Sequence, residues 1–317
     1  MTVQNLTIKG KFNENYIKST ILDIYLKWKI PDNIEEILII DDKKHFSAIS
    51  RRIPKHLRKE FKETYMNDPT SLSITAGNFD LIIISITQPN EQYLKKNKKA
   101  LEGLIAHELM HIELRRMGLD LDIENIGQRV FQNFIKKNLN RSQSIKYKHV
   151  FEEIKNQCSY VLKDIVTNAN LIEIGFGDEM FEDYYQYYIN QKTLKTANLN
   201  ISAVKNSNLC STVSKKKCKE LYEKQLGVDV GTSILFELSL LPVIIPYGKK
   251  WINTKERKIK HLINFIGDNY EILVSDIAQD ADRLIKKSFT SKFDKKYFEY
   301  FFEYFFKMAH KKMLIDQ

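Results

Sequence analysis

The sequence predicts an α+β protein, with a mixed sheet near its N-terminus and a mostly helical C-terminal half. Apolar runs of strand length, rich in Ile, Leu and Phe, occur before about residue 90. Beyond about residue 92, apolar residues recur at spacings of three and four, as they do in amphipathic helices. Strands followed by a long helical remainder are typical of the α+β class rather than of alternating α/β units.

The first third of the chain is predicted to contain two helices and four strands. The first helix has apolar side chains at helical spacing and ends before Pro31. A strand pair is predicted where Gly77 and Asn78 separate two apolar runs. In chain order the predicted elements are a helix at 15–29, strands at 36–41 and 45–50, a helix at 55–66, and strands at 71–75 and 79–87.

The remainder is predicted to be helical. A polar stretch at 196–214 is the best candidate for a boundary, which gives an α+β domain over 1–195 and a helical domain over 196–317. The aromatic run at 293–308 has Phe and Tyr at helical spacing, which indicates core packing, with a partner surface as the alternative. The predicted helices are 93–117, 123–139, 150–172, 179–192, 215–225, 254–266, 270–288 and 295–313.

Composition excludes several classes of protein. A chain of 317 residues that is 43% hydrophobic and 28% charged is neither disordered nor a small disulfide-stabilised module. The net charge of +10 would suit a polyanionic partner, but only nine of the 50 basic residues are Arg and the Lys clusters are scattered. Nucleic-acid binding is therefore not favoured.

Cysteine usage and hydropathy predict a cytoplasmic protein. Cys158, Cys210 and Cys218 form no C-x-x-C pair, which indicates a reduced compartment. No apolar run follows the basic residues near the N-terminus, so no targeting signal is predicted. The apolar stretch at 230–247 is interrupted by one Glu and two Pro, and it predicts a buried helix and turn rather than a membrane span.

One pattern in the sequence indicates a chemical function. It is His107-Glu108-Leu-Met-His111, within residues 100–118 (ALEGLIAHELMHIELRRMG). On a helix, residues four apart lie about 40° from each other, so both imidazoles can reach one metal ion. Glu108 lies about 100° round from His107, beside the metal, where a carboxylate can take a proton from a zinc-bound water.

The surroundings of this pattern strengthen the metal interpretation. Random shuffling would produce H-E-x-x-H in roughly one such chain in a hundred. The segment from Leu104 to Met117 lacks Pro and Gly and is apolar almost all round, which predicts a buried helix, with Glu102 and Glu113 facing water. Two partly buried imidazoles would carry a desolvation penalty unless something bound them. A metal site is therefore favoured over two core histidines hydrogen-bonded to the backbone.

This stretch resembles the active-site helix of the zincin metallopeptidases. The resemblance implies Zn²⁺ as cofactor, a peptide or protein substrate, and Glu108 as the base in peptide hydrolysis. It also implies a sheet before the helix whose edge strand holds the substrate; the run 79–87 stands in that region, as an edge or an interior strand. The alternative is a binding or regulatory protein that retains this architecture, with structural zinc or none.

Which residue would be the third zinc ligand depends on which branch of the zincins the chain resembles. The metzincin continuation requires Gly and His where this chain has Leu114 and Met117, so that branch is excluded. A gluzincin-like arrangement takes a carboxylate from a second helix. The acidic residues available downstream are Glu124, Glu152, Glu153, Asp164 and Glu173.

Helix geometry narrows this choice. In the predicted helix 150–172 a polar stripe between the core face and the solvent face contains Glu153, Asp164 and Asn168. The run DIVTN resembles the gluzincin Glu-x-x-x-Asp, which implies Asp164 as third ligand and Asn168 as the residue that orients a ligand histidine. Glu153 is the alternative third ligand.

A group that stabilises the oxyanion is also implied, and the sequence does not choose among the candidates. They are Tyr147, His149, Tyr184, Tyr185, Tyr187, Tyr188 and His261.

Overall fold

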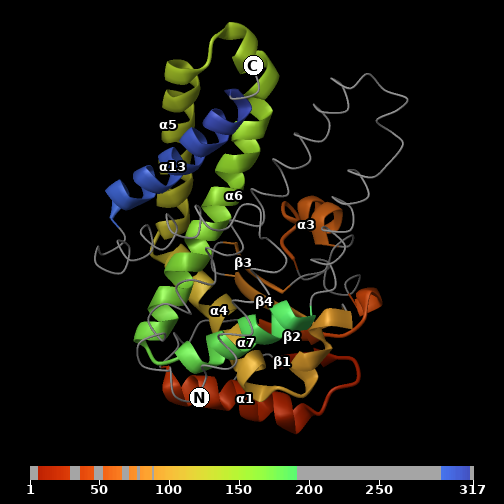
Figure 1. Ribbon diagram of the computed structural model, residues 1–317. Coiled ribbons are helices and arrows are strands. Elements are labelled where there is room, and N and C mark those ends of the chain that lie inside the picture. Colours follow the sequence, from red (N-terminus) through yellow and green to blue (C-terminus); the bar gives the residue numbers. More distant parts are fainter. Residues whose placement is uncertain are drawn as a thin grey trace, which may run out of the picture. The chain divides into compact units, whose positions relative to one another are not determined.

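The computed structural model describes residues 6–28, 36–45, 53–65, 71–76, 79–87, 89–190 and 294–314 (Figure 1). These residues form a small mixed sheet and are otherwise mostly helical, which confirms the predicted α+β class. Residue contacts divide the chain into two compact units. The first comprises Met1–Met117 and Thr167–Asn190, and the second comprises Gly118–Val166 and Gln191–Gln317.

The sheet of the first unit has four strands in the order β1-β2-β4-β3. Strands β1 (Leu6–Lys9), β2 (Glu36–Ile40) and β4 (Phe79–Ser85) are parallel, whereas β3 (Leu72–Ala76) pairs antiparallel with β4. The run 79–87 therefore supplies an interior strand, and β3 lies at the edge of the described sheet. Strand β1 was not predicted, because four partly exposed residues leave little apolar signal.

Both faces of the interior strands are buried, which explains why β2 and β4 are continuous apolar runs rather than alternating ones. On one face, Ile53 and Phe61 pack with side chains of β2 and β4, and Phe61 lies in α3 (Arg58–Tyr65). The neighbouring residues of each strand project to the opposite face and are equally inaccessible to solvent. The first face includes Leu38, Ile40, Leu81 and Ile83, and the second includes Ile37, Ile39, Ile82 and Ile84.

The central helix of the first unit is α4 (Lys98–Arg116), which contacts α1 (Glu14–Lys27), α7 (Gly177–Asn190) and strands β3 and β4. The prediction of one helix over 93–117 was wrong at its start, because Pro89–Lys95 form a 3₁₀ helix. Asn97 then caps α4, its side-chain oxygen accepting from the Ala100 amide at 3.2 Å.

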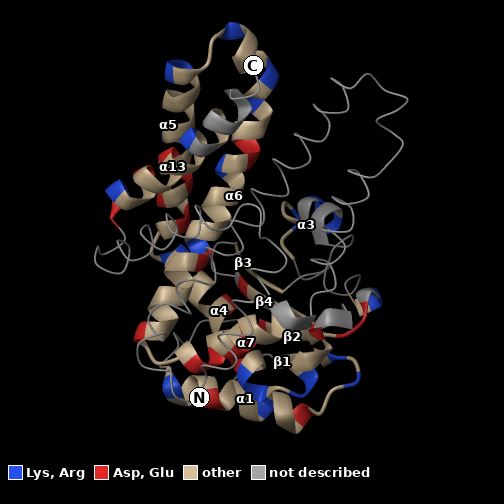
Figure 2. Ribbon diagram, viewed as in Figure 1, with Lys and Arg blue, Asp and Glu red and all other residues tan. Residues whose placement is uncertain are grey.

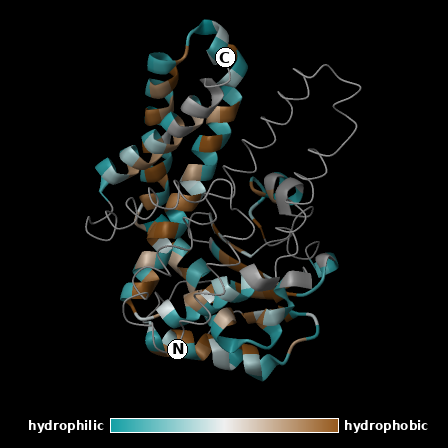
Figure 3. Ribbon diagram, in the orientation of Figure 1, coloured by the Kyte–Doolittle hydropathy of each residue, from teal (hydrophilic) through white to brown (hydrophobic). Residues whose placement is uncertain are grey.

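The described part of the second unit consists of α5 (Leu119–Asn138), most of α6 (Arg141–Glu173) and α13 (Lys295–Leu314). The three helices share an aromatic core, in which the ring of Phe134 lies 5.1 Å from Phe151 and 5.3 Å from Phe306. The core packing predicted for the aromatic run is confirmed for its buried Phe residues. Figure 3 shows hydrophobic and hydrophilic residues alternating along α5 and α6, as this packing requires.

Several predictions concern parts of the chain outside the described residues. They include the boundary at 195, the apolar stretch 230–247 and the helices 215–225, 254–266 and 270–288. The predicted strand 45–50 is wrong at His45, which ends a 3₁₀ turn, Lys43–His45, and its other residues are not described. No helix among the described ranges is both long and apolar enough to cross a membrane.

Candidate metal centre

The two histidines of the H-E-x-x-H pattern face each other on α4. The Nε2 atoms of His107 and His111 are 2.9 Å apart, and the ring centroids are 4.5 Å apart with the planes at 83°. Both side chains are half-buried, while most of their neighbours on α4 are buried. The two rings thus lie on the same side of the helix, as the i, i+4 spacing predicts.

The outer nitrogen of His107 is held by Asn168 of α6. His107 Nδ1 lies 3.0 Å from Asn168 Oδ1, and Asn168 Nδ2 donates to the hydroxyl of Tyr184 at 2.8 Å. Because the amide nitrogen donates to Tyr184, the amide oxygen faces His107 and accepts a hydrogen bond from Nδ1–H. This network assigns the tautomer of His107 whose Nε2 carries a lone pair directed at His111.

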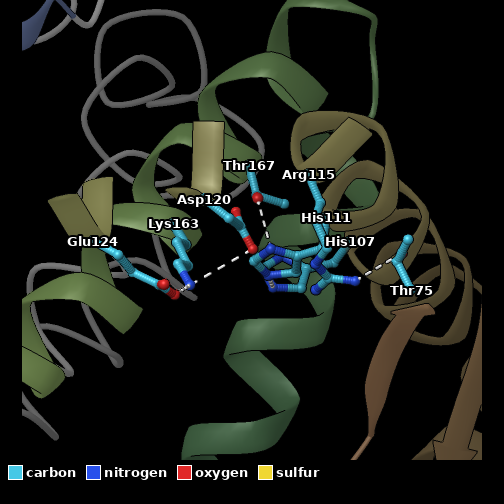
Figure 4. Close-up of polar contacts among 8 residues, drawn as sticks. All are labelled: Thr75, His107, His111, Arg115, Asp120, Glu124, Lys163 and Thr167. Carbon is cyan, nitrogen blue, oxygen red and sulfur yellow. Dashed lines mark hydrogen bonds and ion pairs between the residues drawn. The ribbon is translucent and has the colours of Figure 1, made fainter. Parts of the chain in front are cut away.

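His111 is held by Thr167, whose Oγ1 lies 3.2 Å from His111 Nδ1 (Figure 4). A hydroxyl can donate or accept, so Thr167 supports either tautomer of His111. With Nδ1 protonated, the Nε2 lone pairs of both histidines point toward the same region. In the other tautomer, His111 Nε2–H donates to His107 Nε2 at 2.9 Å, so the pair is held either by this hydrogen bond or by a cation that both Nε2 atoms ligate.

Asp164 completes a group of possible metal ligands. One ligand atom from each of His107, His111 and Asp164 lies within 4.8 Å of the others. Helix α6 carries Asp164, Thr167 and Asn168. Two imidazoles and a carboxylate are a donor set that zinc accepts in catalytic sites.

The alternative ligand, Glu153, is not part of this group. It precedes Asp164 by 11 residues, or about 16 Å along α6. Its side chain is exposed and accepts a hydrogen bond from Gln157 Nε2 at 2.9 Å. Another acidic candidate, Glu124, pairs with Lys163 at 2.7 Å (Figure 4). Of the carboxylates considered from the sequence, the structure brings Asp164 to the histidines.

Glu108 is buried on α4, next to His107. It lies close enough to Asp183 of α7 for the two charges to interact. Asp183 is also buried and accepts a hydrogen bond from the hydroxyl of Tyr93 at 3.1 Å. Burial, together with the charge of Glu108, raises the pKa of Asp183 to about 7, although Tyr93 and His107 oppose the rise.

Two arginines at the end of α4 connect it to the sheet. Arg115 Nη1 donates to Thr75 Oγ1 of β3 at 3.0 Å, and Arg116 forms an ion pair with the buried Asp80 of β4. Thr75 also donates to Asp80 at 2.7 Å. These contacts hold the C-terminal end of the histidine helix against β3 and β4.

The structure separates the candidates for stabilising an oxyanion. Tyr184 lies beside the site through its hydrogen bond with Asn168. Tyr147 and His149 precede Asp164 on α6 by more than four turns. The side chain of Tyr188 and all of His261 lie outside the described residues. Tyr185 and Tyr187 lie on α7.

Sequence reasoning missed Thr167, Tyr93 and Asp183. Thr167 stands inside the DIVTN run and could have been found from its helical spacing to Asp164. No local signal marks Tyr93 or Asp183, because the hydrogen bond between them joins residues 90 positions apart.

Comparison of the chain with family models, curated proteins and solved structures gave no match. The resemblance to zincins therefore depends on the H-E-x-x-H motif and on the side-chain geometry around it.

Proposed function

We propose that this protein is a zinc-dependent amide hydrolase that acts on peptides or proteins. The observation that carries the proposal is the pair of Nε2 atoms 2.9 Å apart, with Asp164 in the same cluster and Glu108 adjacent on the helix. The Nδ1 atoms of both histidines contact α6, so the two Nε2 atoms that face each other are the ones that would ligate a cation.

The residues present fit a zinc ion. His107, His111 and Asp164 would hold it, and three protein ligands leave a position open for substrate. When bound, the ion would polarise a carbonyl group and lower the pKa of a coordinated water.

The protein's own acid–base group is Glu108. It would accept a proton from the attacking water and return that proton to the departing amine nitrogen, so that one carboxylate serves as base and then as acid. Tyr184 is the best candidate for donating to the oxyanion, because its hydroxyl lies beside the site, where it accepts a hydrogen bond from Asn168.

A peptide substrate is supported by the position of β3. This strand lies at the edge of the described sheet, and Arg115 links its Thr75 to the histidine helix. An extended peptide that paired with β3 would pass close to the end of α4.

The proposal is tested by metal analysis and peptide hydrolysis on the same preparations. The wild type should contain one zinc per chain and cleave members of a peptide library. Glu108→Gln should retain the zinc and lose at least about a hundredfold in the rate of hydrolysis, because it removes the base but no ligand. Asp164→Ala should lose zinc, whereas Glu153→Ala, the matched change on the same helix, should retain both zinc and activity.

Two results would contradict the proposal. A wild type that carries stoichiometric zinc and cleaves no peptide would exclude catalysis and favour a regulatory or structural role. Full activity in Glu108→Gln would exclude this residue as the base.

A further inference from the structure

A hollow lies within the first unit, formed by α1, the first turns of α4 and the corner that leads from α6 into α7. Its volume is about 660 Å³, which is in the range of small-molecule sites. We call it the acidic pocket, after the two buried carboxylates in its lining, Glu102 and Glu179. Glu102 was predicted to face water; it is only 6% exposed, and that prediction was wrong.

The close approach of α4 and α7 explains the burial of both carboxylates. A Cβ atom built on Gly103 would lie 2.4 Å from the backbone oxygen of Glu179, so only glycine allows the two helices to meet here. The side chains next to this contact, Glu102 on α4 and Glu179 on α7, are thereby brought to the same pocket.

The lining carries one more negative charge than positive. Three lysines face four carboxylates, and three ion pairs form: Lys27 with Glu179 at 2.5 Å, Lys98 with Asp23 at 2.5 Å, and Lys99 with Asp178 at 3.4 Å. Within the described part of the chain, Glu102 is in none of these pairs. Figure 2 shows acidic and basic residues next to one another along α1.

One oxygen of Glu179 has no hydrogen-bond partner among the described residues. Glu179 is 3% exposed; its Oε1 accepts from Lys27, and its Oε2 is buried and unpartnered. Lys27 is held in place because its ammonium also lies 5.2 Å from the centre of the Phe176 ring. A buried carboxylate oxygen without a donor costs stability, so a donor from a ligand would be favourable here. Burial, and after it the charge of Glu179, raise the pKa of Glu102 above its usual value.

These features select the class of ligand. An excess of one negative charge favours a cation over an anion. A metal ion is not favoured in this pocket. Among the described residues, the group of three side chains placed to hold a metal ion is His107, His111 and Asp164, and none of these lines the pocket. The pocket is much larger than an ion, and Leu26 at its edge is 76% exposed, which offers an apolar surface to an alkyl chain.

We propose that the acidic pocket binds a small aliphatic primary amine as its ammonium ion. The ammonium group donates to Glu179 Oε2 and to the carboxylate of Glu102, and the alkyl chain lies along Leu26. The site is separate from the histidine cluster, so the proposal does not depend on the proposed hydrolase activity.

The test is calorimetric titration with n-butylammonium chloride, using n-butanol and sodium chloride at matched concentration as ligand controls. The wild type should bind n-butylammonium and neither control. Glu102→Gln and Glu179→Gln should each weaken binding by about tenfold or more, since each removes a charged acceptor. Glu14→Gln, an exposed carboxylate change at the other end of α1, should bind as the wild type does. Circular dichroism checks that each variant is folded.

His107→Ala with His111→Ala should also bind as the wild type, because the amine does not use the histidine cluster. The proposal is overturned if n-butylammonium gives no more heat than sodium chloride, or if both glutamine variants keep the wild-type affinity. Loss of binding in the double histidine variant would place the amine at the metal centre, and equal binding of Mg²⁺ would indicate an ion site. Either result would also overturn it.

Discussion

Asn168 determines the orientation and the tautomer of the His107 ring. Its amide oxygen faces His107 Nδ1 at 3.0 Å, while Tyr184 holds its amide nitrogen at 2.8 Å. The sequence resemblance implied an orienting residue at 168, but the gluzincin pattern has a carboxylate where this chain has an amide. An amide orients the ring as a carboxylate does, and it adds no negative charge beside the imidazole.

Replacing Asn168 by Leu should therefore weaken zinc binding by about 10- to 100-fold, because the tautomer and orientation of His107 are no longer held. Asn168→Asp should strengthen binding, since an anionic acceptor raises the basicity of the ligand. Competition with a chromophoric chelator measures both. Asn156→Leu, at an exposed position on the same helix, is the control. Equal affinity in Asn168→Leu and wild type would show that Asn168 does not orient the ligand.

The raised pKa of Asp183 predicts that the stability of the fold depends on pH. Its pKa is raised from 3.8 to about 7 in the folded state, so between these values the folded protein keeps a proton that the unfolded chain has lost. This group therefore destabilises the fold increasingly from about pH 4 to pH 7, and the penalty is fully present above pH 7. Asp183→Asn keeps an acceptor for Tyr93 and removes the charge.

In chelator-treated protein, the melting temperature of Asp183→Asn should equal that of the wild type near pH 4 and exceed it increasingly up to about pH 7. Thermal unfolding monitored by circular dichroism provides the measurement. Glu152→Gln, an exposed change on α6, should follow the wild type at every pH. A difference between Asp183→Asn and wild type that does not vary with pH would argue against a raised pKa.

At the scale of the elements, α6 shows what helical periodicity in the sequence could predict and what it could not. Its predicted core face is buried at Cys158, Leu162 and Ile165. The predicted polar stripe, however, changes along its length: Tyr160 is 63% exposed, whereas Asn168 is fully buried. Helical spacing places residues on the same side of a helix, but which turns are covered depends on what packs against them. Helical spacing alone therefore could not show which carboxylate of the stripe, Asp164 or Glu153, lies near the histidines.

The packing of α4 against α7 depends on Gly103. Alanine normally stabilises the interior of a helix relative to glycine by about 1 kcal/mol. Here the added methyl group meets the backbone of Glu179 and Met180, which cannot move without shifting α7. Gly103→Ala should lower the free energy of unfolding by about 1–3 kcal/mol in chemical denaturation. Gln132→Ala, at an exposed site on α5, should change it little. Stabilisation by Gly103→Ala would contradict the close contact.

At the scale of the whole molecule, the histidine cluster joins distant parts of the sequence. His107 contacts Asn168, 61 residues further along, and the chain leaves the first unit after Met117 and returns to it at Thr167. A cation bound by His107, His111 and Asp164 would therefore cross-link α4 to α6 and stabilise the folded state.

Zinc at a hundred times its dissociation constant should add about 2.7 kcal/mol to the free energy of unfolding of the wild type. The double variant His107→Ala, His111→Ala should show no such gain. Adding a chelator to the zinc-loaded wild type should remove the gain. Differential scanning calorimetry with and without zinc measures the effect. The same gain in the double variant would locate the zinc elsewhere in the chain.

The sequence by itself determined the α+β class, most of the described helices, the interior strands β2 and β4, and the H-E-x-x-H helix. Each of these follows from local periodicity or from two residues on one turn. The resemblance of the run DIVTN already favoured Asp164 over Glu153, and the structure brings Asp164 to the histidines. The tertiary structure alone decided that Glu102 is buried and that Tyr93 and Asp183 pair. Those outcomes depend on contacts between segments 60 to 90 residues apart, and local sequence patterns contain no information about which distant side chains will meet.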